Sequence, residues 1–533
     1  MPSAGGQMQQ LPAVPTTPRQ PSPWLLQQPP TTQPLVTESQ TSTVMVTRLH
    51  VTGARVYAES ELVKVAGFEP GRAVTLQALS DMADKITQHY RRDGFLVARA
   101  YLPAQEIKDG LVTVAVLEGQ YGHVNVNNSS ALSAQVPRDV LSGLNAGDVI
   151  ATGPLEERLL LLSDVPGVQV RSTLVPGASV GLSDLIVEVK PGSRVSGSVD
   201  ADNAGNRYTG ENRIGITLNV NSPTDRGDLI TLRGLTSGTG LQYVRATYQA
   251  PVGRGRLGVA YSDLSYALGH EFQPLDANGH ARMATLFGSY PVVRSRNTNV
   301  NIGLALDSKV FQDRVDAIPS LTDKRAQVAT ATVYGDHRDA LGAGGLSAYS
   351  LAWSTGQLNL QTPAARALDA STAASHGAYN KLAFGISRLQ QTAIERISVF
   401  ASLSGQVASK NLDVSEKMEL GGMYGVRAYP EGEAYADEGY LLTLEVRKQL
   451  PLDVAGQLHV AAFVDAGVVT LNQSPWTSAN NTRHLSGAGV GLYWTRASDF
   501  SVRMFYAHKL GDGVALSAPD KSGRFWVQAV KYF

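Results

Sequence analysis

Two short motifs in the second half of the chain could hold a loop and a strand together by charge. They comprise Val426, Arg427, Ala428 and Tyr429 in a polar stretch, and Phe463, Asp465 and Gly467 on an alternating strand. Arginine can bind a carboxylate through two parallel, charge-assisted hydrogen bonds, which makes such a pair a strong anchor. We therefore predict that Arg427 binds Asp465. The alternative is that Arg427 is a solvated loop residue and that Asp465 lines a water-filled channel.

The other groupings of reactive residues do not match a catalytic, metal or cofactor site. Residues 177–181 satisfy G-x-S-x-G, but a strand is expected after them, whereas a nucleophile elbow leads into a helix. His270 and Glu271 do not continue to H-E-x-x-H, and the ten histidines lack ligand spacing. The alternating glycines of residues 487–491 are expected to leave room on one face of a sheet. The sequence predicts neither enzyme activity nor a cofactor.

Length and composition restrict the class of protein. The 533 residues exceed the ~250–300 at which single cores stop growing, so several domains are expected. Lys plus Arg and Asp plus Glu both number 46, which gives no field of one sign to attract nucleic acid. The absence of cysteine excludes disulfides and thiolate metal sites. Since about 18 apolar residues never follow one another, no helical membrane span is expected.

The first 43 residues differ in composition from the rest of the chain. Residues 1–43 are rich in Pro, Gln, Thr and Ser, and Trp24, Leu25 and Leu26 form their one apolar cluster. Such a segment cannot bury a core, so we expect a disordered or extended linker. The apolar cluster could instead begin a short plugging or docking helix. The initial MPSAGGQMQQ lacks the character of an export signal, which we expect to have been removed.

Two copies of one small α+β domain are expected at residues 44–120 and 121–192. The first copy reads as a strand, two helical stretches and two further strands, and the second copy repeats this β-α-α-β-β order. One face of the helix at 75–92 should pack on a three-stranded sheet. The residues of that face are Leu76, Leu79, Met82, Ala83, Ile86 and Tyr90.

The remaining residues, 193–533, are expected to form a transmembrane antiparallel β-barrel, which makes the protein mainly β. Apolar and polar side chains alternate, as at residues 213–220. We predict about 16 strands of ~10 residues, with short and long connections in turn, an asymmetry typical of outer-membrane barrels. The even number places both ends of the barrel in the periplasm. The last strand ends at Phe533, a terminal aromatic residue that resembles the assembly signal of outer-membrane proteins.

The connections between these strands are predicted from turn residues and polarity. The short ones follow Val220, Gln249, Ser289 and Lys448, and each is expected to place a proline where a strand ends. The long, polar ones are expected to be extracellular loops, at residues 307–323, 355–379, 407–439 and 469–483. The VRAY motif, residues 426–429, lies in the longest of them.

Both motifs resemble those of a known superfamily. They are similar to the loop-six VRGY-type motif and the F-x-D-x-G strand motif of the BamA-like transporters and insertases that carry periplasmic POTRA domains. Ala428 stands where that loop motif has glycine, while Arg427 and Tyr429 match it. Two POTRA-like repeats, with DNAGNRYTGENR and LSGAGVGLYW in the barrel, make residues 44–533 resemble the two-partner secretion (type Vb) transporters of the TpsB, ShlB and FhaC type.

This resemblance implies an outer-membrane translocator whose N-terminal domains lie in the periplasm. The POTRA-like domains would recognise an unfolded secreted partner, a TpsA-like exoprotein, and the barrel would export it, with the Arg427–Asp465 pair holding loop six in the lumen. Outer-membrane lipid, lipopolysaccharide and the barrel-assembly machinery are further implied partners, and nucleic acid is not. A barrel-assembly insertase is the alternative function, and a barrel enzyme such as a lipase is a third.

Overall fold

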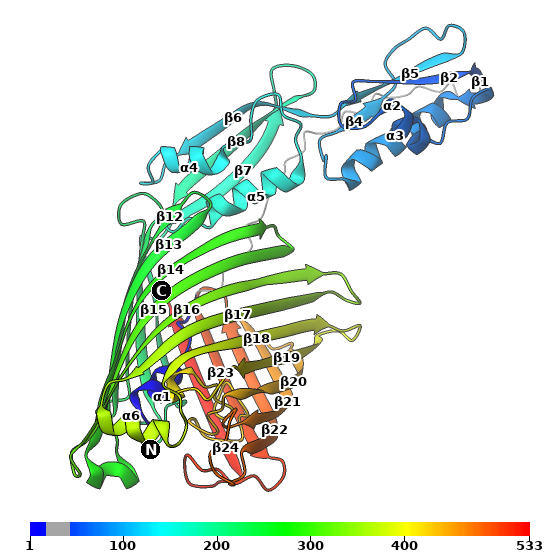
Figure 1. The fold of residues 1–533 in the computed structure, drawn as a ribbon. Coiled ribbons are helices and arrows are strands. Elements are labelled where there is room, and N and C mark those ends of the chain that lie inside the picture. Colours follow the sequence, from blue (N-terminus) through cyan, green and yellow to red (C-terminus); the bar gives the residue numbers. More distant parts are fainter. Residues whose placement is uncertain (17–42) are drawn as a thin grey trace. The chain divides into compact units, whose positions relative to one another are not determined.

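A computed structural model of the chain describes residues 1–16 and 43–533, which belong to two units. One unit contains Ser193–Phe533 together with the N-terminal segment, and the other ends at Gly192 (Figure 1). Among the described residues, no helix combines the length and the apolar character needed to cross a membrane.

The first small domain contains a three-stranded sheet, covered by two helices, and a separate pair of strands. Its elements are β1 (Thr43–Val46), β2 (Arg48–Thr52), α2 (Glu59–Ala66), β3 (Arg72–Thr75), α3 (Leu76–Arg92), β4 (Arg99–Tyr101) and β5 (Leu111–Leu117). The sheet order is β2-β5-β4, with β2 and β5 parallel. The pair β1-β3 was not expected, because β3 is a four-residue strand with little pattern of its own.

Helix α3 shows why the predicted apolar face is mostly correct. Its cap is Thr75, whose hydroxyl accepts a hydrogen bond from the backbone N–H of Ala78 at 3.1 Å. Leu79, Ile86 and Tyr90 are buried in the core. The prediction is wrong for Leu76, which is 56% exposed, because this first residue of the helix lies outside that core.

The second small domain has the same helix-on-sheet plan. Its elements are β6 (Gln120–Asn128), α4 (Gln135–Leu141), α5 (Thr152–Ser163), β7 (Val168–Pro176) and β8 (Leu182–Pro191). They form a sheet of order β6-β8-β7 with β6 and β8 parallel, and a separate apolar core. Residues 177–181 connect the strands β7 and β8, which is not the strand-to-helix geometry of a nucleophile elbow.

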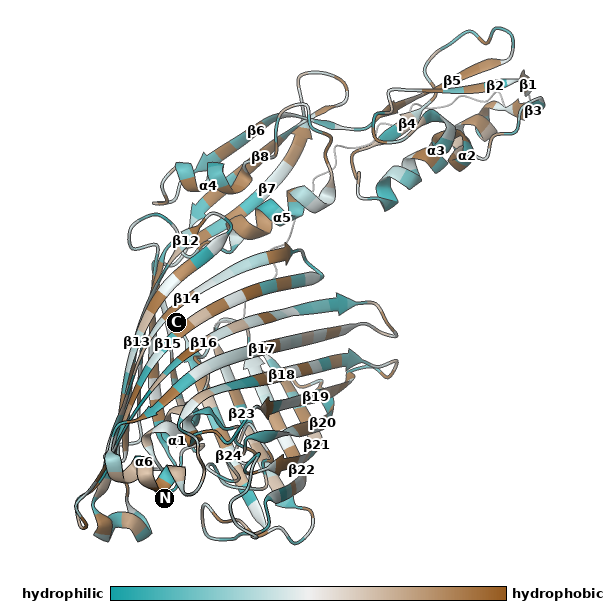
Figure 2. Cartoon of the chain, viewed as in Figure 1, coloured by the Kyte–Doolittle hydropathy of each residue, from teal (hydrophilic) through white to brown (hydrophobic). Residues whose placement is uncertain are grey.

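Within residues 193–533, all of which are described, sixteen antiparallel strands close into a barrel, as predicted. They are β9 (Val195–Asp202), β10 (Arg213–Asn221), β11 (Leu229–Thr236), β12 (Leu241–Val252), β13 (Gly255–Ala267), β14 (Ala277–Arg294), β15 (Thr298–Val315), β16 (Ser320–Asp339), β17 (Gly345–Leu360), β18 (Gly377–Gln391), β19 (Ile397–Ala408), β20 (Glu438–Leu450), β21 (Gln457–Thr470), β22 (Thr482–Arg496), β23 (Phe500–Lys509) and β24 (Gly523–Tyr532). Apolar and polar residues alternate along them (Figure 2). Ile214 and Ile216 are exposed on the outer face, whereas Arg213 and Thr217 are buried.

The predicted loop boundaries are wrong where strands are longer than expected. Strands β14 to β17 have 16 to 20 residues, so the loop expected at 307–323 contains only residues 316–319. The loop expected at 355–379 contains residues 361–376, including the short helix α6 (Pro363–Ala370). Backbone pairing does not require apolar side chains, so it continues past the apolar band. For example, Arg314 of β15 pairs with Leu321 of β16.

One of the prolines expected at strand ends lies inside a strand instead. Pro251 is the last residue but one of β12, as expected, and pairs with Arg256 in the β12–β13 ladder. Pro291 lies in β14 where the register with β15 shifts. Proline cannot donate to a ladder, but it is tolerated at such bulges and near strand termini.

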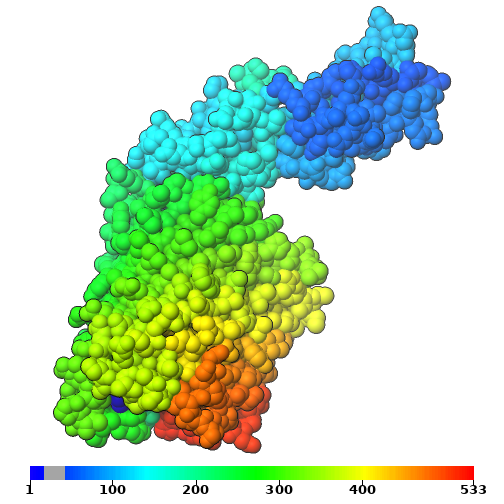
Figure 3. Space-filling view, in the orientation of Figure 1, coloured from blue at the N-terminus to red at the C-terminus, as the bar shows by residue number. Residues whose placement is uncertain are grey.

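The N-terminal segment corrects the expectation of a linker without structure. Residues Ala4–Gln9 form the short helix α1, which lies inside the barrel against β13, β14 and β15. In the space-filling view only a small part of this dark-blue segment is visible (Figure 3). The polar, glycine-rich hexapeptide carries no helical pattern in its sequence, and its partners are residues of the lumen. Trp24, Leu25 and Leu26 lie outside the described residues, so the helix expected there stays a prediction.

Candidate functional site: a loop anchored in the barrel lumen

Residues 409–437 connect β19 to β20 and fold back into the lumen, and we call them loop six. Val426, Arg427, Ala428 and Tyr429 at its tip are all buried. The tip packs in an apolar cluster with Phe463, Phe505 and Trp526 from the barrel wall. A long polar loop is therefore enclosed in the lumen.

Arg427 and Asp465 form a bidentate ion pair at this tip. Nε and Nη2 of Arg427 donate to the two carboxylate oxygens of Asp465, each at 2.8 Å, and the Arg427 backbone N–H donates to Oδ2 at 3.2 Å. The two side chains are only 5% and 0% exposed. Since Asp465 and Phe463 share the inner face of β21, the strand aims both at the loop tip.

Sequence reasoning missed several further partners of Arg427. Its Nη1 donates to Oε1 of Glu445 on β20 at 2.8 Å, and its guanidinium lies 3.4 Å from the ring centroid of Phe463. The Trp526 indole N–H donates to the carbonyl oxygen of Arg427 at 2.7 Å. A signal for Glu445 was present, because in LLTLEVRK it alternates with leucines and valine and so belongs to the inner face.

Glycines of the wall make room for the loop. A Cβ added at Gly487 would lie 2.5 Å from the Ala428 Cβ, and one at Gly467 would lie 2.3 Å from Leu420 Cδ1. Likewise, a Cβ added at Gly489 would lie 2.5 Å from Cζ of the Phe463 ring. Phe463, Asp465 and Gly467 therefore contribute a stacking ring, a carboxylate and an empty space to one binding surface for loop six.

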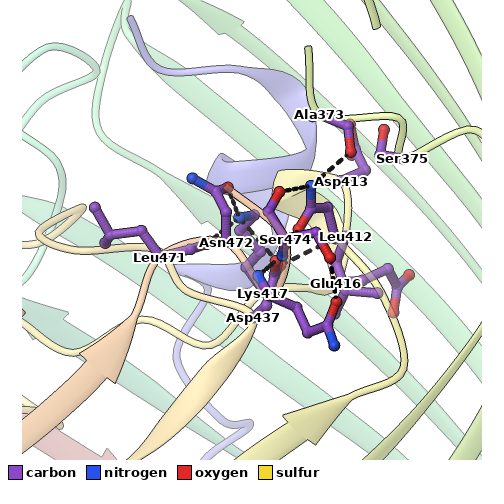
Figure 4. A network of polar contacts seen from close by, with 12 residues as sticks. Ala373, Ser375, Leu412, Asp413, Glu416, Lys417, Asp437, Leu471, Asn472 and Ser474 are labelled. Carbon is purple, nitrogen blue, oxygen red and sulfur yellow. Dashed lines mark hydrogen bonds and ion pairs between the residues drawn. The ribbon is translucent and has the colours of Figure 1, made fainter. Parts of the chain in front are cut away.

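The neck of loop six is fixed by a second polar network, drawn in Figure 4. Lys417 Nζ lies 3.0 Å from Asp437 Oδ1, and this same oxygen accepts the backbone N–H of Leu412 at 2.9 Å. Asn411 donates to the carbonyl oxygens of Ala373 and Ser474 at 2.8 and 2.7 Å. The loop is thus tied to its neighbours at both the neck and the tip.

Helix α1 and loop six fill adjacent parts of the lumen. Gln10 Nε2 donates to the hydroxyl of Tyr435 in loop six at 2.6 Å. Arg213 of β10 donates to the Gln10 carbonyl at 2.9 Å, and it also binds Asp202 of β9. A chain passing through the lumen would have to displace these contacts.

The C-terminal residue Phe533 lies on the opposite, outer side of the wall. It is 55% exposed, and its backbone exchanges hydrogen bonds with Gly197 next to the closing β24–β9 seam. That seam has five residue pairs, the smallest number in the barrel. Lys531, which interrupts the apolar face of β24, binds Asp499 in the turn between β22 and β23.

Comparisons with known proteins agree with this architecture. The profile of the haemolysin secretion/activation proteins ShlB/FhaC/HecB matches residues 181–494, and the ShlB-type POTRA domain matches residues 44–119. The chain is 30% identical over 480 residues to the heme/hemopexin transporter protein HuxB of Haemophilus influenzae, with 89% of this chain and 84% of HuxB covered.

Solved structures share the fold at low sequence identity. CdiB from Escherichia coli superposes with a TM-score of 0.74 at 19% identity, covering 95% of this chain and 93% of CdiB. BamA from Haemophilus ducreyi lacking POTRA domains 1–3 gives a TM-score of 0.56 at 12% identity, covering 92% of this chain and 100% of that structure. Profile, relatives and fold agree with the predicted sixteen-stranded barrel and its outer-membrane location. The chain therefore belongs to the ShlB/FhaC/HecB family of haemolysin secretion/activation proteins, the outer-membrane transporters of two-partner secretion.

Proposed function

We propose that residues 44–120 and 121–192 capture one unfolded secreted partner in the periplasm and that the barrel of residues 193–533 passes it outward. The relatives named HuxB and CdiB are transporters, which supports this function. The observation that carries the proposal is the buried but ionic attachment of loop six. Water can replace ionic contacts, so a lumen closed in this way can be reopened. No catalytic step and no cofactor is part of the proposal.

Arg427 and Asp465 are the proposed loop-to-lumen lock. Both charges are removed from water, and Nη1 of Arg427 also binds Glu445. Removing one partner of a buried ion pair leaves the other uncompensated, at a cost of about 3–5 kcal/mol. The loop would then lose its place in the lumen even though the barrel strands stay paired.

Strand addition is the proposed mode of partner capture. In the described part of the small domains, β2 and β4 are the edge strands of the first three-stranded sheet, and β6 and β7 are those of the second. An extended chain can add to such an edge through backbone hydrogen bonds, with little dependence on its side chains. Folding of the exported partner outside the cell would supply the driving force, because the periplasm offers no ATP.

The outer face of the barrel supports the remaining proposed partners. Exposed apolar residues such as Leu304, Leu306 and Val446 would contact outer-membrane lipid and lipopolysaccharide. The terminal Phe533 would be read by the barrel-assembly machinery during biogenesis.

The test is secretion of the partner protein, compared between wild type and variants. Arg427→Ala and Asp465→Ala should each reduce secretion by about tenfold or more, because the first leaves the buried Asp465 carboxylate without its cation and the second leaves Arg427 with Glu445 alone. Arg282→Ala is the matched control, since Arg282 pairs with Asp263 at 3.0 Å on the exposed outer face. Heat-modifiable gel mobility verifies that each barrel is folded.

Each outcome decides a different part of the proposal. Undiminished secretion in both lumen variants would contradict the lock, and export of the partner without this chain would contradict the function. The alternative of a barrel-assembly insertase predicts that deletion leaves many outer-membrane barrels misassembled rather than one protein retained.

A further inference from the structure

Helix α1 packs on a part of loop six, and charged residues of the barrel wall hold that part of the loop in place. The turn Val414–Glu416, labelled η2, packs directly on α1. A Cβ added at Gly5 would lie 2.7 Å from the Ser415 Cβ, so the two backbones approach as closely as glycine permits. Helix α1 therefore contacts both the wall and loop six.

Three wall lysines hold this turn. Lys309 of β15 lies 2.6 Å from Glu416 Oε1, and Lys381 of β18 lies 2.9 Å from Glu416 Oε2. Lys324 of β16 lies 2.9 Å from Asp413 Oδ2. All of these side chains are 16% exposed or less, so water has little access to these ion pairs.

Lys324 differs from the other two lysines because it also lies close to the carboxylate that holds α1. Its Nζ is 3.8 Å from Asp313 Oδ2. The other oxygen of Asp313 accepts the backbone N–H of Ala4, the first residue of α1, at 2.7 Å. It also accepts the Tyr266 hydroxyl at 2.8 Å. One ammonium group therefore lies between the carboxylate that fixes the helix and the carboxylate that fixes the loop.

We propose that Lys324 is a positioning residue that couples α1 to loop six, so that release of one weakens the attachment of the other. When α1 leaves, Asp313 loses the Ala4 N–H, and its charge is then left to Lys324 and Tyr266. Lys324 shifts toward Asp313, and its hold on Asp413 weakens. When loop six moves first, Asp413 departs and the same ammonium is left with Asp313 alone. Lys309 and Lys381 hold the loop without this link to the helix.

This coupling rests on the proposed transport function but is measured without secretion. The chain has no cysteine, so a single introduced thiol is the only one that a maleimide can label. Met8→Cys reports on α1, where Met8 packs in the lumen cluster, and Leu412→Cys reports on loop six, where the buried Leu412 packs in a separate cluster on the barrel wall. The labelling rate of folded protein in outer-membrane vesicles, with a bulky maleimide added outside, measures how often each site opens.

Lys324→Met should raise the labelling rate at both reporters by about tenfold or more, because the buried carboxylates lose their shared cation. Lys309→Met is the matched control, because it removes one buried lysine from the same turn without touching Asp313. It should raise the rate at Leu412→Cys but change the rate at Met8→Cys by less than about threefold. Lys324→Arg keeps the charge and should restore slow labelling at both sites.

Asp313→Asn provides an independent test in case Lys324→Met does not fold. It should raise the labelling rate of α1. The labelling rate of loop six should not exceed that of the parent, since Lys324 then pairs with Asp413 alone. Equal exposure of α1 in Lys324→Met and Lys309→Met would overturn the proposal, because packing of the turn would then explain the link. Slow labelling of α1 in Lys324→Met would overturn it as well. Secretion can fail or persist in any of these variants without changing the labelling result.

Discussion

The first small domain and the barrel lumen are both buried interiors, but they are built from different chemistry. The core of the domain consists of aliphatic and aromatic residues such as Leu62, Ile86 and Tyr90. The lumen instead buries charged groups, including Arg427 and Asp465. Transfer of apolar surface into water is unfavourable, so opening such a core costs free energy in proportion to the apolar area exposed. Ion pairs can exchange their partners for water, which is what the proposed opening of the lumen requires.

The largest expected effect tests the apolar half of this comparison. Leu62→Ala removes most of a fully buried side chain and should destabilise the first domain by about 2–5 kcal/mol. The expected result is fast hydrogen exchange throughout residues 44–120 while the barrel keeps its heat-modifiable mobility. Met45→Ala is the control, because Met45 is 58% exposed, and it should change stability by no more than about 0.5 kcal/mol. Unchanged exchange in Leu62→Ala would mean that this core does not hold the domain.

A smaller effect is expected where the lumen depends on shape rather than on charge. Gly487→Ala places a methyl group 2.5 Å from the Ala428 Cβ, so the loop tip must shift, at about 1–3 kcal/mol. Gly303→Ala on β15 is the control, because the nearest atom to its Cβ would be 3.6 Å away. The thermal midpoint of heat-modifiable mobility should fall for Gly487→Ala and not for Gly303→Ala. Equal midpoints would show that the tip has free space around it.

The sequence predicted those features that repeat along the chain. Alternation predicted the barrel and its strand number, because each wall strand must separate an outer apolar face from an inner polar one. The inner position of Asp465 followed from the same alternation. Glu445 was predictable on that basis too, but a single strand does not show which charges meet across a lumen.

Other features depend on contacts between distant residues. Helix α1 is six residues long, too short to be stable alone, and its hydrogen bonds run to residues hundreds of positions away, such as Asp313. No local pattern encodes such a partner. The extra length of β14 to β17 was missed for a related reason, since backbone pairing above the apolar band leaves no alternation of hydropathy.

The smallest expected effect concerns a charge that stays in contact with water, in contrast to the lumen pairs. Glu59 at the start of α2 lies 2.7 Å from His50 Nδ1 and also accepts the Val51 backbone N–H. The hydrogen bond with His50 is the main cause that holds the pKa of Glu59 below its ordinary value of 4.5. A carboxylate with a lowered folded-state pKa adds stability above its ordinary pKa, and this contribution is lost as the pH falls through the folded value.

Glu59→Gln should therefore be less stable than wild type at pH 7, and this small difference should shrink once the pH falls below about 4.5. Hydrogen exchange of residues 44–120 between pH 7 and pH 3, corrected for the intrinsic exchange rate, measures it. Glu69→Gln is the control, because the Glu69–Arg72 pair is more than 60% exposed on both sides. A difference that stays constant over this range would assign the role of Glu59 to packing. A difference that disappears with acid would show that exposed charges in the small domain add only modest, titratable stability, whereas the charges that hold loop six in the lumen are buried.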